Sequence, residues 1–189
     1  MNNRKHLTTG EINDMLSASG AGRYPERDWC LIKMSFMHGL RASEACQLRV
    51  SDIDLRERIV YIRRLKGGFS TVHPLTQEEL PGLKNWIRLR KLWRGADSDW
   101  LFLSQKGGPL NRRHVHTLIK RYGEQANISV TSHPHMLRHA CGYALADSGA
   151  DTRLIQDYLG HRNIRHTVIY TASNPKRFVG LWKGNRSVK

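Results

Sequence analysis

The chain has 189 residues and is strongly basic, with 31 Lys and Arg against 16 Asp and Glu and a formal net charge of +15. A domain of this length folds without needing a disulfide or a metal, and 39% hydrophobic residues exclude a disordered basic tail. The charge therefore indicates a polyanionic partner. Nucleic acid is favoured over an anionic lipid surface, because the basic residues do not line one side of an amphipathic helix opposite Trp, Phe and Leu.

The C-terminal part is expected to be the stronger polyanion surface. Residues 111–189 carry 13 Lys and Arg but only 4 Asp and Glu, and no acidic residue follows Asp157. Cys30, Cys46 and Cys141 stand far apart without a C-x-x-C pair, which argues against a disulfide framework and a thiolate zinc site. No apolar segment resembles a signal peptide or approaches the roughly 18 residues of a membrane span. We therefore expect a cytoplasmic protein.

The N-terminal third is predicted to be helical. Thr8 and Glu11 form a capping-box pattern for a helix that stops at Gly20. Apolar spacing predicts a second helix over residues 25–38 and a short third one over 43–48.

A β-hairpin is predicted next, because residues 58–63 and 69–74 are extended runs flanking the turn sequence Lys66-Gly67-Gly68. Thr76 and Glu79 form another capping-box pattern, which starts a helix through residue 89, and residues 100–103 suggest a brief strand. The remaining predicted helices begin at an Asn111 cap and run through residue 122, and then cover 134–148, 152–159 (capped by Asp151) and 164–172. With no repeat or linker, residues 1–189 are expected to form one mainly α domain with a small antiparallel β insertion.

Five features with chemical potential stand out against these elements. They are Arg41 at a helix start, Lys66 in the hairpin turn, His135-Met136-Leu137-Arg138, His161 after Leu159-Gly160, and Tyr170 nine residues beyond that histidine. Each alone has an ordinary explanation, such as a surface cation or a helix cap. Together they resemble the tyrosine site-specific recombinases, the integrase family, over about residues 7–180. Residues 133–174 are similar to the bacterial invertases that switch fimbrial genes on and off.

Cleavage of a phosphodiester needs a nucleophile, neutralisation of the nonbridging oxygens and a proton for the leaving oxygen. The resemblance implies the tyrosine recombinase catalytic-domain fold and assigns Tyr170 as the nucleophile, which yields a 3′-phosphotyrosyl DNA and a free 5′-hydroxyl. It implies that Arg41 and Arg138 bind the nonbridging oxygens, for which forked guanidinium donors are suited. Lys66 would protonate the leaving 5′-oxygen.

The resemblance further implies that His135 assists proton transfer and that His161 hydrogen-bonds the phosphate. Because the phosphotyrosine conserves the bond energy, no ATP, metal or other cofactor is expected. A metal site is disfavoured, since His135 and His139 have half of a zincin spacing but Met136 stands where the general-base Glu is needed. Tyr158, within an apolar helix, is expected to be a core residue.

The implied partners are double-stranded DNA with inverted repeats, a homotetramer in the synaptic complex, and accessory DNA-bending proteins. The last are expected because about forty residues precede Arg41, which leaves no separate N-terminal DNA-clamping domain. Residues 173–189, with Phe178, Leu181 and Trp182, are expected to contact a neighbouring subunit or DNA. The candidate DNA-contacting residues are Arg112, Arg113, His114, His116, Arg162 and Arg165.

The function predicted from the resemblance is inversion of a DNA segment in the bacterial nucleoid, with phase variation of fimbrial gene expression. Three alternatives remain open at this point. They are a DNA-binding regulator without strand exchange, a type IB topoisomerase, and a metal-dependent nuclease, although the last lacks a carboxylate cluster.

Overall fold

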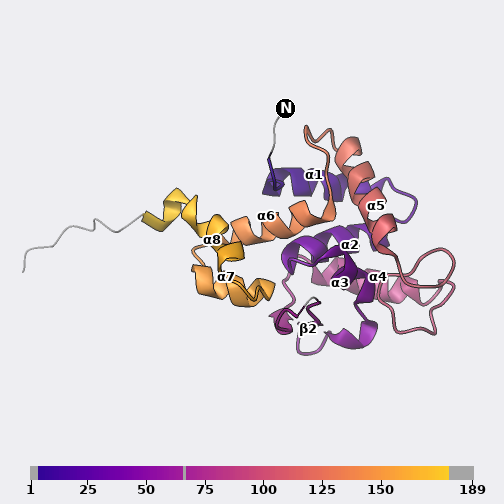
Figure 1. Cartoon of the computed structure of the whole chain (residues 1–189). Helices are drawn as coiled ribbons and strands as arrows, with labels where there is room; N and C mark the ends of the chain where they lie inside the picture. Colours follow the sequence, from indigo (N-terminus) through magenta and orange to yellow (C-terminus); the bar gives the residue numbers. More distant parts are fainter. Residues whose placement is uncertain (1–3, 66, 179–189) are drawn as a thin grey trace, which may run out of the picture.

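Helices dominate the computed structural model, which describes residues 4–65 and 67–178 (Figure 1). The α-helices of these ranges are α1 (Thr9–Gly20), α2 (Pro25–Met37), α3 (Ala42–Gln47), α4 (Leu80–Arg90), α5 (Arg112–Gln125), α6 (Pro134–Asp147), α7 (Thr152–Leu159) and α8 (Arg165–Ala172). Two 3-10 turns, η1 (Val50–Asp52) and η2 (Pro175–Phe178), and a small antiparallel sheet accompany them. The predicted fold class, mainly α with a small antiparallel β insertion, is confirmed.

Side-chain caps begin several helices where the sequence predicts them. The Thr8 hydroxyl accepts from the backbone N–H of Glu11 at 3.2 Å, and the Glu11 carboxylate accepts from the N–H of Thr8 at 2.8 Å. Asn111 and Asp151 cap α5 and α7 by accepting from the N–H three residues further on. These caps can be predicted from sequence because they satisfy, locally, backbone donors that have no partner within the helix.

One helix starts later than predicted. The Glu79 carboxylate accepts from the backbone N–H of Thr76 at 2.6 Å, but the intervening residues form turns and α4 begins only at Leu80. A helix starting at residue 77 would place Pro81 in its interior, where a helical N–H is needed. The observed start puts Pro81 in the first turn, where its missing N–H costs nothing.

The sheet has the order β1 (Ile53–Asp54), β2 (Ile59–Ile62) and β3 (Thr71–Pro74), with Val60 opposite His73 in the predicted hairpin. The sequence did not predict β1, which has only two residues. The prediction of a strand at residues 100–103 is wrong, because Trp100 and Leu103 form only isolated bridges to Arg49 and Pro109. Leu101 and Phe102, between them, lie in a bend and are fully buried, so this run reflects burial in the core rather than a ladder.

Helix α2 is central to the core and packs against α1, α4 and α6, and Figure 1 shows it between them. Helices α7 and α8 pack against each other and against α6 at one end of the molecule. The three cysteines are unpaired and buried, and burial raises the pKa of the Cys141 thiol to about 12. None of the helices within the described ranges has the length and apolar character that a membrane span requires.

Candidate active site

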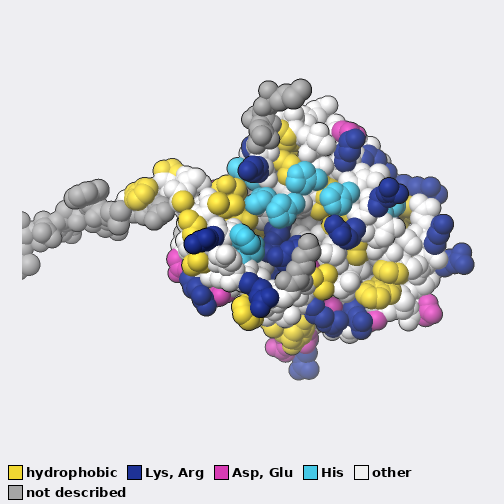
Figure 2. Space-filling model, in the orientation of Figure 1, with side chains coloured by type: hydrophobic (Ala, Val, Ile, Leu, Met, Phe, Trp, Pro, Cys, Tyr) yellow, Lys and Arg dark blue, Asp and Glu magenta, His cyan; other side chains and the backbone are white. Residues whose placement is uncertain are grey.

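A cavity of about 410 Å³ lies where α3, α6, α7 and α8 approach one another. It is lined by Arg41, His135, Arg138, His139, His161, Arg165, His166, Ile169 and Tyr170. The structure therefore brings together, from residues spread over 130 positions of sequence, every predicted catalytic residue that it describes. Lys66 lies outside the described residues. Figure 2 shows histidines and basic side chains gathered on one face of the molecule.

Local structure explains how these side chains reach one cavity. Arg41 is the residue immediately before α3. His135, Arg138 and His139 lie three or four positions apart in α6 and so share a face of that helix. Gly160 ends α7 in the left-handed conformation, with φ +64°, and thereby turns the chain so that His161 faces the site.

Arg138 is a buried cation whose guanidinium hydrogen-bonds to backbone carbonyls. Its guanidinium donates to Gly39 O at 2.5 Å and to Leu159 O at 2.7 Å, and it lies 3.8 Å from the Glu44 carboxylate. Burial, followed by the charges of Arg64 and Arg41, lowers the pKa of Arg138 to about 9, so the side chain is still positively charged at neutral pH. A buried guanidinium that is only partly neutralised favours binding of an anion in the cavity that it lines.

Glu44 is the carboxylate at the centre of this charge cluster, and it was not among the site residues predicted from the sequence. It accepts from the Arg41 guanidinium at 2.6 Å, from the Arg41 backbone N–H at 2.9 Å and from Arg64 at 3.0 Å. Burial alone would raise the pKa of Glu44, but Arg64, Arg41 and Arg138 outweigh burial and hold that pKa below its ordinary value. An acidic residue three positions after a helix-start arginine is the signal that could have identified it. Three guanidiniums thus share one carboxylate.

Tyr170 is only 1% exposed, and its hydroxyl lies 3.0 Å from His139 Nδ1. Burial raises the pKa of Tyr170 to about 12, and burial, followed by the charges of His135 and Arg138, lowers the pKa of His139 to about 4. Both groups are therefore neutral near pH 7, and the phenol can donate its hydrogen bond to the imidazole. His139 was missed as a partner of Tyr170 because only the packing of α8 on α6 brings the two residues together.

Gly142 makes this close packing of α8 on α6 possible. A Cβ atom at Gly142 would lie 2.6 Å from ring atoms of Tyr170. Tyr143 packs edge-on against the Tyr170 ring, with 5.1 Å between ring centroids. Tyr158, the alternative tyrosine, is half-buried, donates to Met37 O at 2.9 Å and does not line the cavity.

His161 is held by its neighbours in a defined orientation. Its Nδ1 lies 2.9 Å from the Thr167 hydroxyl, and its backbone carbonyl accepts from the Gln156 side chain at 2.9 Å. Burial, followed by the charges of Arg138 and Arg41, lowers the pKa of His161 to about 3. A neutral ring that accepts from Thr167 through Nδ1 carries its proton on Nε2 and can donate it to a phosphate oxygen.

The candidate DNA-contacting residues fall into two groups. Arg112 and His116 line a second cavity of about 290 Å³ that shares Arg41 and His135 with the first, and Arg165 lines the first cavity itself. The others, Arg113, His114 and Arg162, are exposed and line neither cavity. Of the predicted contact segment 173–189, Phe178 is exposed, whereas Leu181 and Trp182 lie outside the described residues.

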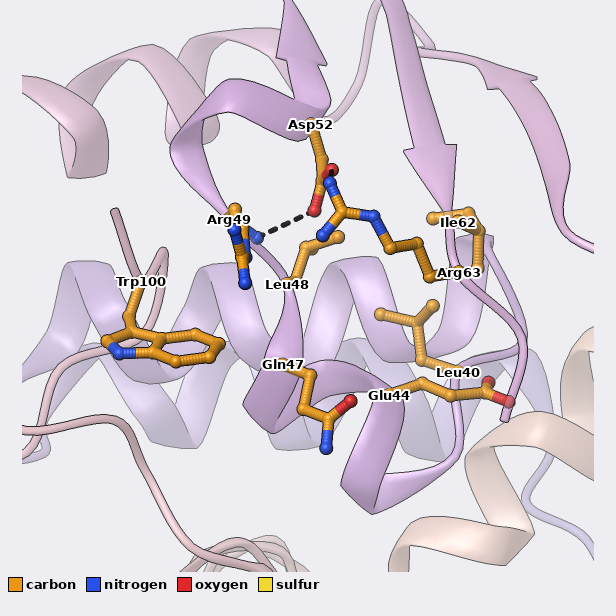
Figure 3. A pocket seen from close by; sticks show the side chains of 9 residues that line it. All are labelled: Leu40, Glu44, Gln47, Leu48, Arg49, Asp52, Ile62, Arg63 and Trp100. Carbon is orange, nitrogen blue, oxygen red and sulfur yellow. Dashed lines mark hydrogen bonds and ion pairs between the residues drawn. The ribbon is translucent and has the colours of Figure 1, made fainter. Parts of the chain in front are cut away.

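A third, smaller cavity of about 60 Å³ is lined by residues of α3 and of the segments that follow it, among them Glu44, Asp52 and Arg63 (Figure 3). There the Asp52 carboxylate accepts from the Arg49 backbone N–H at 2.9 Å and pairs with Arg63. Figure 3 shows the Glu44 carboxylate pointing away from Asp52. The carboxylates of Glu44 and Asp52 thus form ion pairs with different arginines. Within residues 4–65 and 67–178, no group of three or more His, Cys, Asp or Glu is arranged to hold a metal ion.

Comparison with known proteins defines the class. The model of the Phage integrase family matches residues 5–177. The chain is 55% identical over 179 residues to the type 1 fimbriae regulatory protein FimB of Escherichia coli K12, covering 95% of this chain and 90% of that protein. It is 51% identical over 189 residues to FimE of the same strain, covering 100% and 96%. The chain therefore belongs to the phage integrase family.

Solved structures agree. The crystal structure of XerA recombinase matches with a TM-score of 0.81 and 27% identity over 97% of this chain. The XerH site-specific recombinase bound to its difH substrate matches with a TM-score of 0.79 and 27% identity over 95% of this chain. The matches span 66% and 55% of those longer chains. The resemblance to tyrosine recombinases of the fimbrial type is confirmed, and so is the enzyme class, which cleaves and religates DNA.

Proposed function

We propose that this tyrosine recombinase inverts a DNA segment between short inverted repeats, through a 3′-phosphotyrosyl intermediate on Tyr170, and thereby switches fimbrial gene expression. The observation that carries the proposal is the single cavity in which the Tyr170 hydroxyl and the guanidiniums of Arg41 and Arg138 meet. The biological role rests on the 55% and 51% identity to two type 1 fimbriae regulatory proteins over nearly their whole length.

The charge of the site suits a phosphodiester. Arg41 and Arg138 both line the cavity, and we assign them to the nonbridging oxygens. Arg64 adds a third positive charge against the one carboxylate of Glu44. As the phosphorus becomes five-coordinate, negative charge builds up on those oxygens. Fixed guanidiniums in a buried site stabilise that charge without reorganising, an effect worth about 3–4 kcal/mol for one donor in other enzymes.

The proton movements follow from the neutral groups around Tyr170. The phenolic oxygen forms a bond to phosphorus as the bond to the 5′-oxygen breaks, so the hydroxyl proton must leave. The imidazole Nδ1 of His139 lies 3.0 Å from that hydroxyl, and we assign it as the acceptor of the phenolic proton. His135 contacts the ring of His139, with 4.3 Å between centroids, and we assign it to the same proton transfer. Lys66 is proposed to protonate the 5′-oxygen.

The partner is proposed to be duplex DNA, bound across the cavity and the adjoining one that Arg112 and His116 line. Arg113, His114, Arg162 and Arg165 would add contacts to phosphates or bases. A synaptic homotetramer, accessory DNA-bending proteins and a place in the bacterial nucleoid belong to the same proposal. So does the division of the chain, with residues 1–189 as one catalytic domain and 173–189 as its contact segment.

The test is an inversion assay on a supercoiled plasmid that carries the inverted-repeat pair found beside the gene. Restriction mapping of the product distinguishes inversion from simple relaxation. The expected result is an inverted segment with the native protein and none with Tyr170→Phe, in both starting orientations or in one. Relaxation without inversion would identify a type IB topoisomerase activity instead. Binding with no cleavage would identify a regulator, and either result would reject the proposal.

A further inference from the structure

Arg64 is the second residue after the end of β2 and has a completely buried side chain, with 0% of it exposed. One terminal nitrogen, Nη1, donates to the Glu44 carboxylate at 3.0 Å and to Gly39 O at 3.2 Å. The other, Nη2, donates to His38 O at 2.9 Å and to Tyr158 O at 2.8 Å. Both terminal nitrogens thus have acceptors, whereas Nε is buried without a hydrogen-bond partner among the described residues. Burial of a guanidinium is costly unless its donors are satisfied, so these four bonds are what holds the charge inside the protein.

These four acceptors belong to the segments that carry the proposed catalytic residues. His38 and Gly39 lead into Arg41, and Glu44 is the ion-pair partner of Arg41. Tyr158 lies in the last turn of α7, just before the chain turns at Gly160 to place His161. A single guanidinium therefore joins the segment that presents Arg41 to the segment that presents His161.

Arg64 also lies beside Arg138, because the two guanidiniums share acceptors. Both donate to Gly39 O, and they donate to the neighbouring carbonyls of Tyr158 and Leu159 at the end of α7. Arg64 Nη1 lies 3.0 Å from Glu44 Oε2, whereas Arg138 Nη1 lies 3.8 Å from the same oxygen. Arg64 thus neutralises Glu44 more closely than Arg138 does, which leaves the charge of Arg138 for an anion in the cavity.

Two glycines let the backbone pass close to the Arg64 side chain. A Cβ atom at Gly160 would lie 2.7 Å from Arg64 Cγ, and one at Gly68 would lie 3.0 Å from Arg64 Cβ. Arg63, the preceding residue, points elsewhere, since it pairs with Asp52 and more than half of its side chain is exposed. The two adjacent arginines thus have separate carboxylate partners.

We propose that Arg64 is a positioning residue for strand cleavage, which holds Arg41, through Glu44, and Arg138 in the arrangement that binds the scissile phosphate. This inference rests on the proposed recombinase mechanism. Arg64 does not line the cavity that contains Tyr170. Its effect is therefore confined to steps in which the phosphate charge must be neutralised.

The test compares Arg64→Met and Arg64→Lys with the matched control Arg63→Met. Each variant is assayed for single-turnover cleavage of two nicked suicide duplexes, one with a normal scissile phosphate and one with a methylphosphonate there. The methylphosphonate carries no negative charge, so its cleavage depends less on the position of the guanidiniums. Duplex binding by gel shift and thermal unfolding are measured on the same preparations.

On the normal phosphate we expect Arg64→Met to cleave about 100-fold more slowly than the native protein, the order of effect seen when one stabilising donor is lost. On the methylphosphonate the difference from the native protein is expected to shrink to less than about 5-fold. Arg63→Met is expected to stay within about 3-fold of the native rate on both duplexes, as is usual for surface substitutions. Arg64→Lys retains the charge but not the fork of donors, and we expect an intermediate loss with the same rescue.

Equal losses on both duplexes, or no loss in either Arg64 variant, would overturn the inference. If Arg64→Met does not fold, Arg64→Lys decides by the same comparison of the two duplexes. If the native protein forms no covalent adduct on the normal duplex, the proposed recombinase mechanism fails and not this inference alone.

Discussion

Replacing Glu44 with Gln isolates the charge that holds the arginines of the site together. The amide has nearly the shape of the carboxylate, but it leaves Arg41, Arg64 and Arg138 without a buried negative partner. Removing one member of a buried ion pair costs about 3–5 kcal/mol. Arg41 can relax toward solvent, since a quarter of its side chain is exposed, so we expect a loss of about 3 kcal/mol in the free energy of unfolding. For a domain of this size that is a fall of roughly 6–12 °C in Tm.

The assay is urea unfolding at pH 7, with Glu78→Gln as the control. Glu78 pairs with Lys33 but is 76% exposed, and exposed pairs contribute only about 0–1 kcal/mol. The pKa of Glu44 is lower in the folded protein than in the unfolded chain. The ionised Glu44 therefore stabilises the fold fully at pH values above its pKa in the unfolded chain, and this stabilisation is lost as pH falls through its pKa in the folded protein. The gap between native protein and variant should therefore close at low pH. A loss below about 1 kcal/mol at pH 7 would refute this account of the buried charges.

The shift in Tm caused by inorganic phosphate is a second measurement on the Glu44→Gln variant. With Glu44 neutral, the cavity contains guanidiniums without a carboxylate, and an anion bound there stabilises the folded state by mass action. Phosphate is expected to raise the Tm of Glu44→Gln more than that of the native protein. Equal shifts would mean that the cavity is not the anion site.

Three further predictions follow from the same site. The rate of strand cleavage should not change between about pH 6 and 9 through ionisation of Tyr170 or His139. It should fall as pH approaches 4, because protonated His139 cannot accept the phenolic hydrogen bond. A pH–rate profile of single-turnover cleavage, with His139→Gln as the comparison, checks this. Gly142→Ala should displace Tyr170 and reduce cleavage while duplex binding persists, whereas Gly108→Ala, where a Cβ atom meets nothing within 4 Å, should be neutral; equal activity of the two variants would contradict the close packing. Affinity for duplex DNA should fall on the order of a thousandfold between 50 and 200 mM salt if about six phosphates are neutralised, and a nearly flat salt dependence in a filter-binding assay would contradict an electrostatic interface.

Local sequence signals predicted much of the fold because the interactions that create them are local. Thr8, Asn111 and Asp151 cap helices through bonds to residues three positions away, and such bonds form in the same way wherever the helix lies. The late start of α4 was also local in origin, since Pro81 excludes the earlier start that the capping pattern at Thr76 suggests. The strand predicted at residues 100–103 was wrong because a buried non-strand segment contains the same apolar residues as a buried strand does.

The proposed catalytic residues were selected from the spacing of motifs, and the local pairing of Glu44 with Arg41 offered a similar signal. Arg64 and His139 offered none, because they act through contacts with residues far away in sequence, namely 94 positions from Arg64 to Tyr158 and 31 from His139 to Tyr170. A buried arginine and a surface arginine look alike in sequence, as Arg63 and Arg64 illustrate. Only the three-dimensional structure distinguishes them, because it places Arg64 against Gly39, Glu44 and Tyr158 and Arg63 against Asp52.

The central claim is that Tyr170 becomes covalently bound to DNA within this cluster of arginines and histidines. The most direct measurement is to trap the adduct on a nicked suicide duplex and to map the modified peptide by mass spectrometry. The native protein should yield a single phosphotyrosyl peptide that contains Tyr170, and Tyr170→Phe should bind the duplex but yield none. An adduct on Tyr158 or any other residue, or an adduct in Tyr170→Phe, would contradict the account.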